Sequence, residues 1–207
     1  MRGKFITLEG GEGVGKSTNL LFIKERLEAA GKKVVVTREP GGTEIGEEVR
    51  SILLAHRESS LHETTELLLM FAARAQHLQQ LILPALDAGD WVLCDRFTDA
   101  TYAYQGGGRN LPFEKIKILE DFVQNGLKPD CTFLLDAPIE IGMQRASERG
   151  ELDRFETEEQ QFFHRVRAAY QKLAKLEEDR FHLINASQSL TSVQSEISSA
   201  LDQLLVK

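Results

Sequence analysis

The sequence predicts a three-layer α/β/α protein, with a five-stranded parallel sheet in one domain over residues 1–207. Five short apolar runs alternate with longer stretches whose apolar residues recur at helical spacing. Strands that are separated by crossover helices form a mainly parallel sheet with helices on both faces. No repeat or linker-like stretch divides the chain. The expected strands are Phe5–Leu8, Val34–Thr37, Trp91–Cys94, Thr132–Leu135 and Phe181–Ile184.

The helices are expected from the same spacing and from residues that are typical of helix ends. The first helix ends at Gly31, because glycine is common just after a helix. Longer helical patterns run from Glu63 to about Leu83 and from Glu158 to Glu178. Another helix follows Pro138, since proline is tolerated in a first turn. The last helix is expected to begin with the capping-box pattern Thr191-Ser192-Val193-Gln194.

Charge and cysteine content exclude several classes of protein. The 207 residues carry 25 Lys+Arg against 32 Asp+Glu, a net charge of −7, which argues against a nucleic-acid partner. Two cysteines, Cys94 and Cys131, are too few for a disulfide framework or a zinc site and are expected to be buried thiols. No apolar run reaches the roughly 18 residues of a membrane span, and the start lacks a signal peptide's apolar core. We therefore expect a cytoplasmic protein with no membrane partner.

The first strand is followed by a glycine-rich sequence that matches G-x-x-x-x-G-K-[ST], namely Gly10-Gly11-Glu12-Gly13-Val14-Gly15-Lys16-Ser17. Glycines let successive backbone N–H groups converge on phosphate oxygens, and the helix that begins near Lys16 adds its positive end. Lys16 is expected to reach the β- and γ-phosphates, and the Ser17 hydroxyl to bind Mg²⁺. The guanine-reading string of GTPases and the signature of transporter ATPases are absent. A small kinase or a nucleotide-gated binding protein remains.

Charged residues stand at the carboxyl ends of two strands. Asp95 and Arg96 follow the third strand, and Arg38 follows the second. Ligands of parallel sheets bind at this edge, where an acid beside the P-loop holds Mg²⁺ or its water. Two arginines there indicate a second anion, which guanidinium groups bind bidentately. A phosphate monoester is already ionised at neutral pH, so the absence of an obvious base favours a nucleoside monophosphate kinase.

A segment of mixed charge after the fourth strand, at about residues 145–157, is expected to be a lid. It could equally be a solvated charged turn. As a lid, it would bring arginine to the donor phosphates and exclude water. The P-loop carries Glu12 where some related kinases carry an arginine, so a lid arginine would supply the missing positive charge.

Six stretches in order along the chain carry a family resemblance: Leu8–Thr18, Thr37–Thr43, Leu69–Arg74, Asp95-Arg96, Tyr104–Arg109 and Arg149–Arg154. They resemble the bacterial form of thymidylate kinase. The resemblance implies a P-loop kinase fold, transfer of the γ-phosphoryl group of ATP to dTMP with Mg²⁺, giving dTDP and ADP for dTTP synthesis, and a homodimer. A kinase for another nucleoside monophosphate and, less favoured, a non-catalytic P-loop nucleotide-binding protein are the alternatives. For the dimer, the sequence offers the Glu63–Leu83 helix as a candidate interface, although its apolar stripe could equally be core.

The resemblance also implies roles for single residues at the donor side. The metal ligands would be Ser17 and Asp95, and Glu12 would approach the sugar 3′-hydroxyl or the metal-bound waters. Arg149 would be the lid arginine on the transferring phosphate. The ATP-binding set would be Gly10, Gly11, Glu12, Gly13, Val14, Gly15, Lys16, Ser17 and Thr18, with Arg145 against adenine. The catalytic set would be Lys16, Arg96, Arg149 and Glu12.

At the acceptor side, the resemblance implies that Phe71 stacks on thymine and that Arg74 hydrogen-bonds its carbonyl oxygen. The apolar run Leu67–Phe71 by itself favours a core position for Phe71, but Arg74 on the same helix face favours the site. The other residues implied are Thr101 and Gln105 around the base, Tyr104 against the sugar 2′ position, Arg38 and Arg96 on the dTMP phosphate, and Asp153, Phe155 and Glu156 in the lid. Phe97 departs from the family, in which many members have Tyr or His.

Overall fold

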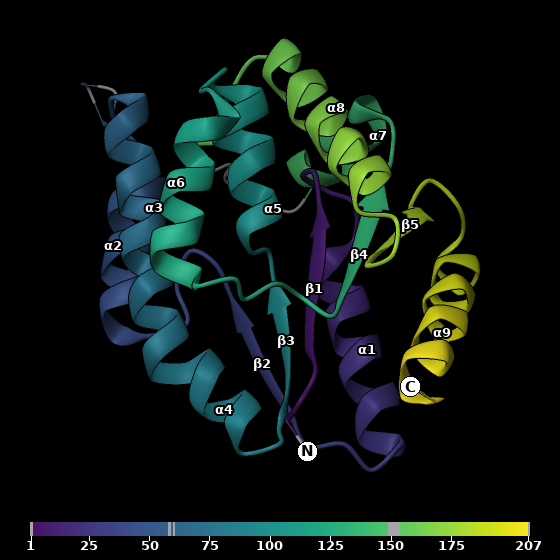
Figure 1. The fold of residues 1–207 in the computed structure, drawn as a ribbon. Helices are drawn as coiled ribbons and strands as arrows, with labels where there is room; N and C mark the ends of the chain where they lie inside the picture. Colours follow the sequence, from purple (N-terminus) through teal and green to yellow (C-terminus); the bar gives the residue numbers. More distant parts are fainter. Residues whose placement is uncertain (1, 58, 60, 149–153, 207) are drawn as a thin grey trace.

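The computed structural model describes residues 2–57, 59, 61–148 and 154–206, and its five strands form one parallel sheet in the order β2-β3-β1-β4-β5 (Figure 1). All five expected strands are confirmed, and each is longer by one or two residues. Their bounds are β1 Phe5–Gly10, β2 Val34–Arg38, β3 Trp91–Asp95, β4 Cys131–Asp136 and β5 Phe181–Asn185.

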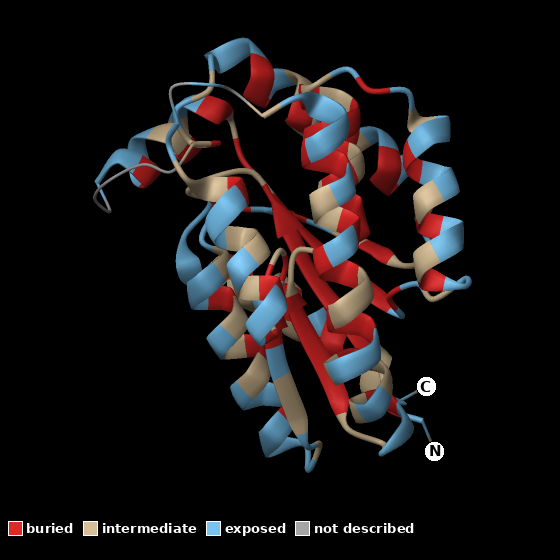
Figure 2. Cartoon of the chain, turned by 90° about the vertical axis from the view of Figure 1, so that its left-hand side faces the viewer, coloured by how far each residue is buried: buried red, intermediate tan, exposed pale blue. Residues whose placement is uncertain are grey.

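The middle strands of the sheet are almost entirely buried, because helices cover both of their faces (Figure 2). This explains why these strands are continuous apolar runs rather than alternating ones. The edge strands β2 and β5 are only partly buried. The register places Arg38 opposite Asp95 and Leu8 opposite Asp95 on the other side, so three strand ends meet at one edge.

One face of the sheet is covered by α1 (Lys16–Ala29) and α9 (Leu190–Val206). Ile23 and Leu27 of α1 and Ile197 of α9 are fully buried in one cluster with residues of the middle strands. The capping prediction for α9 is wrong. The hydroxyl of Ser189 accepts a hydrogen bond from the backbone N–H of Ser192 at 3.2 Å, so the helix begins earlier than the capping-box pattern indicates.

The other face is covered by the helix that was expected between Glu63 and Leu83, and by α8. The expected helix is α3 (Glu63–His77), a π-helical stretch η1 (Leu78–Ile82) and α4 (Leu83–Asp87) in succession. The wider π turn precedes Pro84, whose ring nitrogen cannot donate the regular helical hydrogen bond. The third expected helix is confirmed as α8 (Gln160–Leu176), and the helix after Pro138 as α7 (Ile139–Ser147).

Four further helical elements were not expected from the sequence: α2 (Glu44–Leu54), α5 (Thr98–Thr101), the π-helical η2 (Tyr102–Gly108) and α6 (Phe113–Gln124). The glycines at positions 106–108 belong to η2, which packs against α8. A Cβ atom on Gly107 would lie 2.7 Å from Cβ of Ala169 and 2.9 Å from the carbonyl oxygen of Arg165. These glycines therefore allow two helices to approach closely, rather than a backbone to approach a ligand.

Candidate active site

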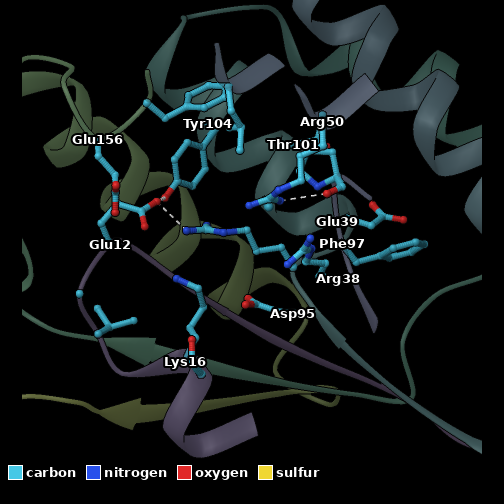
Figure 3. A pocket seen from close by; sticks show the side chains of 18 of the residues that line it. Glu12, Lys16, Arg38, Glu39, Arg50, Asp95, Phe97, Thr101, Tyr104 and Glu156 are labelled. Atoms are coloured by element: carbon cyan, nitrogen blue, oxygen red, sulfur yellow. Dashed lines mark hydrogen bonds and ion pairs between the residues drawn. The ribbon is translucent and has the colours of Figure 1, made fainter. Parts of the chain in front are cut away.

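A cavity of about 670 Å³ opens at the carboxyl edge of the sheet and receives side chains from most of the elements around it. Lys16 and Asp95 lie on one side of the close view, with Tyr104 and Thr101 across from them (Figure 3). The expected site residues that line this cavity are Glu12, Gly13, Val14, Gly15, Lys16, Ser17, Thr18, Arg38, Arg74, Asp95, Arg96, Thr101, Tyr104, Gln105, Arg145, Phe155 and Glu156. Residues that are as many as 144 positions apart in the chain, Glu12 and Glu156, thus share one space.

The P-loop needs glycine at positions where its backbone turns and where α7 approaches it. Gly13 and Gly15 have φ values of 66° and 89°, which side chains disfavour. A Cβ atom on Gly13 would also collide with the carbonyl oxygen of Gly142 in α7. Lys16 folds back over this loop, and its Nζ donates to the carbonyl oxygens of Gly10 at 3.3 Å and Gly11 at 2.7 Å. Gly10 and Gly11 therefore support the lysine and do not line the main cavity.

The ammonium group of Lys16 lies in an environment that disfavours its charge. Burial, and after it the positive charge of Arg96, lowers the pKa of Lys16 below its usual range, although Glu12 and Asp95 oppose this shift. A polyphosphate in the cavity would add negative charge beside Nζ and reverse the effect. The P-loop lysine is thus arranged for an anionic ligand.

Asp95 and Ser17 fit a magnesium ion that is bound together with nucleotide phosphates. The Oδ1 atom of Asp95 is buried, and no residue in the described part of the chain hydrogen-bonds to it. An orphaned carboxylate oxygen beside the P-loop is what a metal-bound water or Mg²⁺ itself would satisfy. Within the described ranges, no group of three or more His, Cys, Asp or Glu side chains could hold a metal alone.

Arg96 lines the cavity and has a left-handed backbone conformation, with a φ of 69°. Its Nη2 donates to Oε1 of Glu12 at 2.6 Å, and its Nη1 donates to the carbonyl oxygen of Gly10 at 3.0 Å. The hydroxyl of Tyr104 also donates to Oε1 of Glu12 at 2.6 Å, and the Arg96 guanidinium lies 4.7 Å from the centre of the Tyr104 ring. Glu12 thus holds the arginine and the tyrosine on the acceptor side of the P-loop.

Beneath Arg96, the fully buried carboxylate of Glu9 fixes the turn that follows β3. It accepts from the backbone N–H of Phe97 at 2.7 Å and from the hydroxyl of Tyr170 at 2.7 Å. Burial, together with the nearby charge of Asp99, raises the pKa of Glu9 from 4.5 to about 8. Glu9 was not singled out from the sequence, because an acid in a strand shows no sign of its partners.

Two arginines line the cavity on the side of β2 and α2. Arg38 is partly exposed and donates to Oε2 of Glu47 at 2.9 Å, which is the main cause that lowers the pKa of Glu47. Arg50 of α2 donates to the carbonyl oxygen of Pro40 at 2.9 Å. Arg50 was not predicted as a site residue because α2 was not expected. The spacing between Arg38 and Arg50 in the sequence matches no motif that would have indicated it. Figure 3 shows Arg38 and Arg50 in the cavity, which Arg96 also lines.

The deep end of the cavity is formed by a buried arginine with one open hydrogen-bond position. Arg74 donates from Nε to Glu39 at 2.8 Å and from Nη2 to the hydroxyl of Thr101 at 2.9 Å. Its Nη1 is buried and has no hydrogen-bond partner among the described residues. The guanidinium lies between two aromatic rings, 4.8 Å from the centre of Phe71 and 5.0 Å from that of Phe97. A carbonyl oxygen of a bound ring would complete its hydrogen bonds.

Phe71 is not placed on the cavity wall. Its ring is 2% exposed and belongs to a cluster with Leu67, Leu111 and Ile116, behind Arg74. The neighbouring Met70 lines the cavity instead. Phe71 and Met70 are adjacent on one helix, so their side chains point in directions about 100° apart. In this structure the Phe71 ring packs against the guanidinium of Arg74, and its stacking on a base stays a prediction.

The lid region is only partly described. Arg149 and Asp153 lie outside the described residues. Phe155 and Glu156 line the cavity, and Arg145 of α7 lines it while donating to the carbonyl oxygen of Ala186 at 3.0 Å. Phe97, which departs from the family, is fully buried and packs edge-on against Phe5, with their ring centroids 4.9 Å apart.

The arrangement can hold two anions that meet end to end. The P-loop with Lys16 and Ser17 suits a polyphosphate, and the arginines beyond it suit a second phosphate. Arg74 then lies where a ring attached to that second phosphate would end. Holding both phosphates in line and screening their charge is the main requirement of phosphoryl transfer.

Comparisons with known proteins agree with this geometry. The family model for thymidylate kinase matches residues 8–197. A thymidylate kinase of Pseudomonas putida (strain GB-1) is 58% identical over 201 residues, which are 97% of this chain and 96% of that protein. A thymidylate kinase of Teredinibacter turnerae is 56% identical over 99% of this chain and 100% of its own length. The crystal structure of thymidylate kinase from Ehrlichia chaffeensis superposes with a TM-score of 0.78 at 33% identity, covering 97% of this chain and 99% of that one.

Proposed function

This chain belongs to the thymidylate kinase family and phosphorylates dTMP to dTDP with ATP, and we propose that the large cavity at the carboxyl edge of the sheet binds both nucleotides. The observation that carries this proposal is the Nη1 of Arg74, to which the described residues give no hydrogen-bond partner, in a cavity that Lys16 also lines. A nucleotide base at Arg74 and a polyphosphate at Lys16 would leave the acceptor phosphate between them.

On the donor side, the P-loop from Gly10 to Thr18 holds the phosphates of ATP, and Arg145 lies against adenine. Mg²⁺ is held by Ser17 and Asp95 with water and phosphate oxygens. When bound, the ion neutralises charge on the β- and γ-phosphates. The open Oδ1 of Asp95 supports this assignment.

On the acceptor side, Arg38, Arg50 and Arg96 bind the phosphate of dTMP, and Glu12 orients Arg96 and receives the sugar 3′-hydroxyl. The acceptor phosphate is its own nucleophile, so no residue has to remove a proton. Thr101, Gln105 and Met70 surround the base, and Tyr104 lies against the sugar. The hydrogen bonds of Arg96 and Tyr104 to Glu12 support this placement.

The catalytic residues are Lys16, Arg96, Glu12 and Arg149. Lys16 and Arg96 touch the reacting phosphates from two sides, and Arg149 supplies charge to the transferring group from the lid. The acidic Glu12 in the P-loop supports a role for such an arginine, because the loop itself offers no second cation at that position.

The family also supports a cytoplasmic homodimer. None of the helices in the described part of the chain has the length and apolarity that crossing a membrane requires. Exposed apolar side chains gather on two neighbouring helices, with Leu68 on α3 and Ile118 and Phe122 on α6, and they form the surface that we assign to the dimer. Phe122 is 81% exposed, and contact with a second subunit would remove this apolar side chain from water.

The assay that tests the proposal measures ADP release with dTMP, dUMP, CMP, AMP and GMP as acceptors, with Mg²⁺ and with a chelator. We expect dTMP to be the best acceptor and the chelator to abolish turnover. Turnover that favours AMP or CMP would overturn the assignment of the base pocket. Full activity in the presence of the chelator would overturn the role of Mg²⁺.

A further inference from the structure

A buried carboxylate behind the cavity, Glu66 of α3, binds one of the residues that line it. The side chain of Glu66 is 1% exposed. Its Oε1 accepts from Nε2 of Gln105 at 2.9 Å, and its Oε2 accepts from Nη2 of Arg154 at 2.7 Å. Arg109 donates to both oxygens, at 3.3 and 3.4 Å. Neither the sequence pattern nor the family resemblance drew attention to Glu66.

This hydrogen bond determines the orientation of the Gln105 amide. A carboxylate flanked by two guanidinium groups is an acceptor only, so it selects the NH₂ group of the amide. The carbonyl oxygen of Gln105 must then point away from Glu66. No described group donates to this oxygen, and Gln105 lines the cavity. The amide therefore offers the cavity an acceptor, whereas the opposite orientation would offer a donor.

The base pocket thus presents an acceptor from Gln105 together with a donor from Nη1 of Arg74. This pattern complements a pyrimidine that carries N3–H next to the O4 carbonyl, as thymine and uracil do. Cytosine presents the reverse, an unprotonated N3 next to an N4 amino group. A site with fixed polar groups of one polarity rejects a ligand of the other, because buried groups would be left unpaired.

We propose that Glu66 is a positioning residue for base selectivity, which favours N3–H pyrimidines over cytosine by fixing the orientation of the Gln105 amide. The proposal rests on the proposed function, in that the base lies beside Gln105 and Arg74. Glu66 itself does not line the cavity, so it acts through Gln105 alone.

The two arginines explain how Glu66 remains in place. Arg154 also donates from Nε to the carbonyl oxygen of Leu53 at 2.7 Å, and Arg109 pairs with Glu158 at 2.6 Å. Both arginines have anchors of their own, so they position the carboxylate rather than depend on it. Replacing Glu66 by glutamine keeps the shape of the side chain. Either the oxygen or the NH₂ group of the new amide can then face Gln105, which removes the selection of one orientation of the Gln105 amide.

The test compares kcat/KM for dUMP and dCMP, since these acceptors differ only at the N3 and C4 positions of the base. For the unaltered protein we expect dUMP to be preferred by roughly 100-fold or more. Glu66→Gln is expected to reduce this ratio by about tenfold. Gln105→Met is expected to reduce it at least as much, and Glu66→Gln should then have no further effect in the Gln105→Met background, because the two residues act as one unit.

Glu120→Gln is the matched control, because it makes the same change at another buried carboxylate, which accepts from the hydroxyl of Tyr102 and not from a residue that lines the cavity. We expect it to leave the dUMP to dCMP ratio within about twofold of the unaltered protein. If it lowers the ratio as much as Glu66→Gln does, Glu66 is only structural and the proposal is overturned. An additive effect of Glu66→Gln and Gln105→Met would overturn it as well.

A binding measurement tests the proposal even if Glu66→Gln does not fold. Binding of dUMP and dCMP to the unaltered protein and to Gln105→Met is measured by calorimetry. Equal affinity of the unaltered protein for the two nucleotides would overturn the proposal. Failure of the proposed function is distinguishable, because the unaltered protein would then phosphorylate neither dTMP nor dUMP.

Discussion

Arg74 donates through Nε to Oε2 of Glu39 at 2.8 Å, in a place where both side chains are almost fully buried. The other carboxylate oxygen of Glu39 lies 3.0 Å from Nδ1 of His77, whose Nε2 is 2.7 Å from the hydroxyl of Thr37. The guanidinium also binds Thr101 and keeps one nitrogen open. A planar group with several donors is needed here, and a charge alone is not sufficient.

Arg74→Lys should therefore weaken acceptor binding. An ammonium group cannot serve Glu39, Thr101 and a base carbonyl in one plane, so we expect KM for dTMP to rise about tenfold or more while KM for ATP is unchanged. Steady-state kinetics with each substrate varied in turn measures both. Arg26→Lys, in an exposed pair with Asp202, is the control and should change neither constant. An unchanged KM for dTMP in Arg74→Lys would contradict the base-recognition role.

Substitutions at Met70 and Phe71 should differ in effect, the first on acceptor binding and the second on the free energy of unfolding. Met70 lines the cavity, so Met70→Ala is expected to raise KM for dTMP severalfold with a modest loss of stability. Phe71 is in the core, so Phe71→Ala is expected to lower the free energy of unfolding by about 3–5 kcal/mol. Urea unfolding and kinetics on both variants check this. If Phe71→Ala loses acceptor affinity at undiminished stability, its ring contacts the base after all.

The protonation of Glu9 should make stability depend on pH. Burial raises its pKa from 4.5 to about 8, so the folded state holds this proton more tightly than the unfolded chain does. The resulting stabilisation is complete below pH 4.5 and is lost as the pH rises to about 8. We expect a decline of a few kcal/mol over that interval.

Glu9→Gln removes this titration while retaining an acceptor for the backbone N–H of Phe97. The difference in unfolding free energy between the two proteins, measured by urea titration across the same interval, isolates the contribution of Glu9. The variant should gain stability relative to the unaltered protein as the pH rises. Parallel pH profiles for the two proteins would show that Glu9 is not responsible.

Arg149→Ala should reduce turnover more than acceptor affinity, because the proposed role of Arg149 is on the transferring group. A fall in kcat of at least about 100-fold with little change in KM for dTMP is expected. A pure loss of dTMP affinity would refute this role. Arg57→Ala, on an exposed arginine that does not line the cavity, serves as the control.

The exposed face of α6 should control assembly. Replacing both Ile118 and Phe122 by serine is expected to shift the protein from dimer to monomer, as measured by light scattering across a range of concentrations. Leu176→Ser removes an equally exposed apolar side chain at the end of α8 and should leave the dimer intact. A monomeric unaltered protein, or a dimeric double variant, would contradict this assignment.

The strands could be predicted well from the sequence, because a short apolar run between two helical patterns is typical of a buried parallel strand. Prediction from the sequence failed for residues whose burial depends on hydrogen-bond partners that are distant in the chain. Glu9 and Glu66 are acids, which are usually exposed, and only the fold shows the donors that accompany their burial. Met70 and Phe71 are neighbours on one helix, and the apolar run does not show that Met70 lines the cavity. Arg50 was missed with the helix that carries it.

The close approach of η2 and α8 has a consequence for how this family can diverge. At Gly107 there is no room for even a methyl group between the two helices, although this residue contacts no nucleotide in our proposal. The helix that carries Tyr104 and Gln105 can therefore accept a new side chain at Gly107 only if α8 shifts at the same time. Evolution at such a position would require paired changes, and a glycine that performs no chemistry can then be as restricted as a catalytic residue.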